Sequence, residues 1–90
     1  MRVLLIEDDA AVAETVRRGL TAEGHSAELA ADARTARTLA AEGSYDAILL
    51  DLNLPDASGY DLIVDLRKSS PQVPVLMVTG RTATEDVVHG

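Results

Sequence analysis

Short runs of apolar residues recur along the chain, each bounded by charged or turn-forming residues. Three of them are continuous and occupy residues 3–6, 47–50 and 75–78. Continuous runs of this length are typical of strands buried on both faces of a parallel sheet, because helices cover both faces there. A fourth stretch, residues 26–30, alternates only weakly between polar and apolar positions, and we predict a strand at the periphery of the same sheet.

Between these runs the apolar residues change to helical spacing. Val12, Val16 and Leu20 recur every four residues and predict an amphipathic helix that buries this face. Asp9 is placed to cap the amino-terminal end of this helix, and Gly24 stands where its carboxyl end is expected.

Three further helices are predicted from their capping residues. Asp32 is a favourable N-cap for a helix that ends at Gly43. Ser58 and Thr82 are each followed three residues later by an acid, which is the pattern of a capping box. We expect them to open two more helices, the first over residues 60–68.

This alternation of strands and helices indicates one α/β domain over residues 1–90, with a doubly wound parallel sheet. Apolar residues make up 47% of the chain, but Phe and Trp are absent, so the core is aliphatic. The net charge of −7 opposes direct binding to nucleic acid, because phosphates would be repelled. Cysteine is absent and no apolar stretch approaches the roughly 20 residues of a membrane span, so we expect a cytoplasmic protein without a membrane segment.

Side chains with oxygen ligands follow the predicted strands. Glu7 and Asp8 follow the first strand, Asp51 the third, and Thr79 the last. Because ligands of open parallel sheets bind beyond the carboxyl ends of the strands, we expect these side chains to lie close together. Carboxylates that lie close together repel one another unless a bound cation offsets their charge. A set of oxygen ligands that includes no His or Cys favours Mg²⁺. A hydroxyl such as that of Thr79 is suited to bond a phosphoryl oxygen.

Each of these acids also has a plainer interpretation. An acidic triplet after a strand, here Glu7, Asp8 and Asp9, is by itself most often a solvated loop or a helix cap. Asp51 taken alone is compatible with an ordinary loop residue. Their place at the ends of buried strands of one sheet favours the cation site, because no structural role requires mutually repelling acids there.

Three segments together resemble a known family. They are Val-Leu-Leu-Ile-Glu-Asp-Asp at residues 3–9, Tyr-Asp-Ala-Ile-Leu-Leu-Asp-Leu-Asn-Leu-Pro-Asp-Ala-Ser-Gly at residues 45–59, and Val-Leu-Met-Val-Thr-Gly at residues 75–80. In order and spacing, over the whole chain, they are similar to the receiver domain of bacterial two-component response regulators. The sequence around Asp51 and Pro55 is most similar to that of receivers that precede winged-helix DNA-binding domains. The resemblance implies a flavodoxin-like receiver fold with strand order 2-1-3-4, and Pro55 and Gly59 match the loop that shapes its site.

The resemblance also implies roles for individual residues. Asp51 matches the phosphoacceptor, which takes a phosphoryl group from a phosphohistidine of a sensor histidine kinase and shares the Mg²⁺ ion. Asp8 matches the direct metal ligand, Glu7 the acid that holds the ion through water, and Asn53 the position whose backbone carbonyl completes the coordination. Thr79 matches the switch hydroxyl that moves toward the phosphoryl oxygen.

The family continues beyond the elements predicted here. It has a fifth strand, which ends in a lysine that bonds the phosphoryl group, and a fifth helix. The chain ends before these elements, and its only lysine, Lys68, lies in the third predicted helix. We therefore expect a receiver domain truncated within or just after its fourth helix. The strand at residues 75–78 would then form an exposed apolar edge, which predicts self-association.

Three functions stay open. The first is a phosphoacceptor receiver, a signalling module rather than an enzyme, which regulates an output such as transcription. The second is an interaction or dimerisation module that keeps the receiver fold without phosphorylation, which the missing lysine favours. The third is a Mg²⁺-dependent phosphohydrolase. It ranks last, because its general acid would stand two residues after Asp51, where this chain has Asn53.

Overall fold

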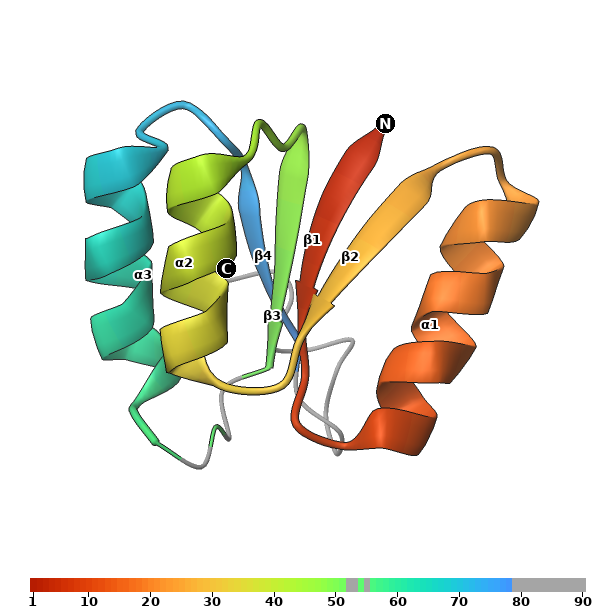
Figure 1. Cartoon of the computed structure of the whole chain (residues 1–90), viewed down its shortest axis with the longest axis horizontal. Helices are drawn as coiled ribbons and strands as arrows, with labels where there is room; N and C mark the ends of the chain where they lie inside the picture. The colour runs from red at the N-terminus through yellow and green to blue at the C-terminus, as the bar shows by residue number, and fades with distance from the viewer. Residues whose placement is uncertain (52–53, 55, 79–90) are drawn as a thin grey trace.

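Strands and helices alternate along the computed structural model, which describes residues 1–51, 54 and 56–78 (Figure 1). The strands are β1 (Arg2–Ile6), β2 (Ser26–Ala30), β3 (Ala47–Asp51) and β4 (Val75–Val78). The helices of this part are α1 (Ala10–Ala22), α2 (Ala33–Glu42) and α3 (Gly59–Ser69). The predicted alternation is confirmed as far as β4, and the helix predicted after Thr82 lies outside the described residues.

The described strands form one parallel sheet in the order β2-β1-β3-β4. This order confirms the doubly wound, flavodoxin-like topology. The chain passes from β1 outward to β2 and then crosses to β3 on the other side of β1, so the order reverses between β1 and β3. Ligands of such sheets bind at the carboxyl ends of the strands beside the reversal. Glu7 follows β1 and Asp51 ends β3, so the fold brings both acids to this position.

One face of the sheet is covered by α2 and α3 (Figure 1). The side chains that fill the layer between them are at most 1% exposed and come from alternate positions of β1 and β3 and from α3: Leu4, Ile6, Ile48, Leu50, Leu62 and Leu66. Helix α2 contributes three buried alanines, which let its backbone approach the sheet closely. The core is aliphatic apart from Tyr45, as the composition predicts.

The opposite face is covered less completely. Leu29, Leu5, Leu49 and Leu76 stand side by side across the four strands. Helix α1 packs against β1 and β2 on this face, and Leu5 beneath it is only 5% exposed. Leu76 on β4 is 41% exposed, because α1 does not extend over that strand. The prediction that the strands are buried on both faces is therefore right for β1. It is wrong for β4, whose Leu76 is exposed.

The buried face of helix α1 is centred one residue away from the predicted one. Ala13 is buried against the sheet, whereas Val12 is 45% exposed and Val16 and Leu20 are half-buried. A small residue at the centre of the contact lets the helix lie close to the strands, and its larger apolar neighbours then flank the contact. The period-four pattern located the helix correctly but placed the centre of its buried face one residue away.

The helix ends agree with the predicted caps. The Asp9 side chain accepts hydrogen bonds from two backbone N–H groups of the first turn of α1. Asp32 and Ser58 cap α2 and α3 in the same way. Gly24, just beyond α1, has φ of +89°, a left-handed conformation that glycine adopts without strain. No described helix has the length and apolar character of a membrane span.

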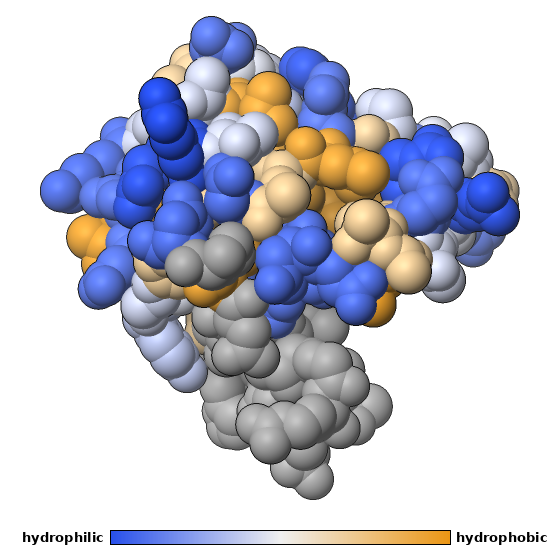
Figure 2. Space-filling view, turned by 60° about the horizontal axis from the view of Figure 1, so that its bottom comes forward, coloured by the Kyte–Doolittle hydropathy of each residue, from blue (hydrophilic) through white to orange (hydrophobic). Residues whose placement is uncertain are grey.

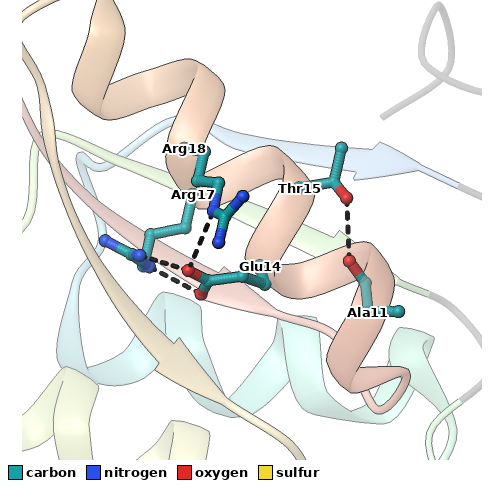
Figure 3. Close-up of polar contacts among 5 residues, drawn as sticks. All are labelled: Ala11, Glu14, Thr15, Arg17 and Arg18. Atoms are coloured by element: carbon teal, nitrogen blue, oxygen red, sulfur yellow. Dashed lines mark hydrogen bonds and ion pairs between the residues drawn. The ribbon is translucent and has the colours of Figure 1, made fainter.

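The charged residues on the outer side of α1 pair with one another (Figure 3). Arg17 donates to the Glu14 carboxylate through Nε at 2.9 Å, and the Nε of Arg18 approaches the same carboxylate at 3.4 Å. These arginines hold the pKa of Glu14 down, to about 2, chiefly through the hydrogen bonds from Arg17. Both arginines therefore neutralise an acid of their own helix.

Candidate metal centre

Three carboxylates gather at the carboxyl end of the sheet, which lies at the bottom of Figure 1. Glu7, Asp8 and Asp51 each place one carboxylate oxygen within 4.8 Å of the others. Glu7 and Asp8 follow β1 and Asp51 ends β3, and the parallel register that pairs Ile6 with Leu50 sets the two strand ends level. The predicted convergence of these three acids is confirmed.

The acids differ in their exposure to solvent. Asp51 is 9% exposed, Glu7 is half-buried, and Asp8 is exposed. The deepest acid therefore lies at the end of the central strand β3, and the cluster opens toward solvent at Asp8. Because three carboxylates meet here, the site favours positively charged ligands.

The proximity of the acids changes the titration of Glu7. Partial burial, a hydrogen bond with the Asp51 carboxyl and the like charge of Asp51 raise the pKa of Glu7 to about 7, and Asp8 adds to this effect. The backbone N–H of Asp9, which donates to Glu7 Oε2 at 3.2 Å, opposes it. Without a cation, Glu7 is therefore about half protonated near neutral pH.

The donor set fits a hard divalent cation. All three ligands are carboxylate oxygens, and the described residues bring no histidine into the group. Oxygen donors of this kind suit Mg²⁺ or Ca²⁺ rather than zinc, and a bound cation would remove the repulsion that raises the pKa of Glu7. The arrangement is thus suited to hold a metal ion beside a nucleophilic carboxylate.

A small apolar groove adjoins the acids. It has a volume of about 60 Å³ and runs from Glu7 and Asp51 between α1 and the sheet, where Leu5, Val12 and Leu49 line it. Figure 2, in which this end of the molecule comes forward, shows hydrophobic surface among hydrophilic side chains. A larger, shallow hollow of about 360 Å³ lies around Tyr45, at the other end of the sheet, and the described residues that line it include no acid.

Several predicted site residues cannot be placed. Asn53, Pro55 and Thr79 lie outside the described residues, so their predicted roles stay predictions. Gly59 is buried and begins α3.

Asp56 was not singled out from the sequence, yet its carboxylate accepts hydrogen bonds from two backbone N–H groups in the first turn of α2. No local pattern signals this contact, because its partners precede it by more than 20 residues.

The raised pKa of Glu7 predicts a pH dependence of stability. The folded chain binds this proton more tightly than the unfolded chain, whose Glu7 has a pKa near 4.5. The stabilisation is therefore complete below pH 4.5 and is lost as pH rises through about 7. We expect the metal-free chain to lose about 1 kcal/mol of unfolding free energy between pH 5 and 8, after allowance for solvent screening. Urea denaturation in the presence of a chelator measures it.

Two variants separate this effect from general changes in charge. Glu7→Gln should flatten the pH dependence, because the titrating group is removed. Glu14→Gln should shift stability equally at both pH values, because Glu14 has a pKa of about 2 and stays ionised throughout. An unchanged pH dependence in Glu7→Gln would contradict the assignment.

Comparison with known proteins agrees with the family resemblance that the sequence shows. The sequence profile of the response regulator receiver domain matches residues 3–90. The chain is 42% identical over 90 residues to the cell cycle response regulator CtrA of Brucella ovis, an alignment that covers 100% of this chain and 39% of that protein. The chain therefore spans about two fifths of the length of the curated relatives it matches.

Solved structures share the fold. A receiver domain protein from Methanospirillum hungatei is 31% identical with a TM-score of 0.86, and the match covers 97% of this chain and 70% of that one. A response regulator from Burkholderia pseudomallei, solved with a phosphorylated aspartic acid, calcium ion and citrate, is 30% identical with a TM-score of 0.84. That match covers 98% of this chain and 54% of the other.

Proposed function

Because the chain belongs to the response regulator receiver domain family, we propose that it is a phosphoacceptor module in which Asp51 takes a phosphoryl group from a sensor histidine kinase. The observation that carries the proposal is the place of Asp51. It ends the central strand β3, is 9% exposed, and lies within the carboxylate group formed with Glu7 and Asp8. A buried acid beside two other carboxylates is repelled by their charge, and this placement suits a nucleophile that reacts next to a cation.

The proposed reaction is a single displacement at phosphorus. One carboxylate oxygen of Asp51 attacks the phosphorus of a phosphohistidine, the P–N bond breaks, and the imidazole leaves with its electron pair. The product is an aspartyl phosphate, a mixed anhydride. The relative from Burkholderia pseudomallei carries a phosphorylated aspartic acid, which supports this product.

The cation proposed for the site is Mg²⁺. Asp8 would bind it directly, Glu7 through water, and Asp51 and the backbone carbonyl of Asn53 would complete the protein ligands. When bound, the ion neutralises charge on the phosphoryl group. Glu7 must give up its proton to take part, so ion binding and proton release are coupled. The switch role of Thr79 is proposed from the sequence resemblance alone.

The proposal extends to the compartment, the output and the self-association of the module. The module would act in the cytoplasm as a reactant of its kinase rather than as an enzyme. It would control an output such as transcription, through a DNA-binding domain of the winged-helix type. The segment itself, with a net charge of −7, would not bind nucleic acid. Self-association is proposed because β4 forms the edge of the described sheet and Leu76 on it is 41% exposed.

A second candidate is an interaction module that has the receiver fold without phosphorylation. Its support is the place of the one lysine in this segment. Lys68 lies in the last turn of α3, at the end of the sheet away from the acidic group, so it does not reach a phosphoryl group on Asp51.

Incubation with acetyl phosphate and Mg²⁺ distinguishes the two candidates. For a phosphoacceptor, the intact mass rises by one phosphoryl group, a chelator prevents the gain, and Asp8→Ala greatly weakens Mg²⁺ binding. Absence of an adduct in a chain that binds Mg²⁺ would favour the interaction module. Light scattering on the same sample tests self-association, which a mass of one chain at all concentrations would exclude.

A further inference from the structure

We draw no further inference here: the strongest candidate, the apolar surface beside α1 formed by the groove of Leu5, Val12 and Leu49 and by the exposed Leu76 of β4, carries none because nothing in the structure shows what covers it.

Discussion

Asp51→Asn is expected to abolish the phosphoryl adduct while it stabilises the metal-free chain. The amide of asparagine lacks the nucleophilic carboxylate oxygen, so no acyl phosphate forms. The substitution keeps the size of the side chain, which is 9% exposed, and removes one of three mutually repelling charges. We expect no mass gain with acetyl phosphate and a rise of about 1 kcal/mol in unfolding free energy at pH 8. Mass spectrometry and urea denaturation measure the two effects.

The opposite signs of these effects make the prediction specific. A substitution that merely damages the fold lowers stability and activity together, whereas a functional acid held against repulsion shows loss of activity with a gain in stability. Asp46→Asn is a suitable control, because Asp46 precedes the same strand at its other end and accepts a hydrogen bond from the Arg2 N–H at 2.7 Å. That variant should lose some stability and keep the adduct. An adduct on Asp51→Asn would place the phosphoacceptor elsewhere.

Much of this fold could be predicted because its signals are local. Apolar runs marked the strands, and the caps at Asp9, Asp32 and Ser58 depend on residues that are close in sequence. The parallel sheet followed from the alternation of elements. Since parallel strands end at the same edge, the meeting of Glu7 with Asp51 followed from the sheet and needed no knowledge of side-chain packing.

What the sequence did not predict depends on contacts between distant segments. The burial of Ala13 in place of Val12 is decided by how closely α1 approaches the sheet. The exposure of Leu76 depends on how far α1 extends over the strands. The Asp56 contact joins residues more than 20 positions apart, and a lone acid in a loop carries no pattern that indicates its partner. The pKa of Glu7 likewise requires the distance to Asp51, which only the folded chain sets.

The covered face of the sheet carries most of the stability, and Leu50→Ala tests this directly. Leu50 is 0% exposed, belongs to the same core cluster as Leu62 and Leu66, and immediately precedes Asp51. Its truncation should cost about 3 to 5 kcal/mol, the sum of lost transfer free energy and an unfilled cavity. A domain of this size has a total margin of only about 5 to 10 kcal/mol. Urea denaturation followed by circular dichroism should show a midpoint shifted far toward zero denaturant.

Leu76→Ala provides the matched comparison, because it removes the same atoms from the other face of the sheet. Leu76 is 41% exposed, so its truncation loses less buried area, leaves no enclosed cavity, and should cost below about 1 kcal/mol. A cost as large as that of Leu50→Ala would mean that a second layer covers Leu76 in solution. If that cost grew with protein concentration, the covering layer would be a second copy of the chain, because only an associating species makes stability depend on concentration.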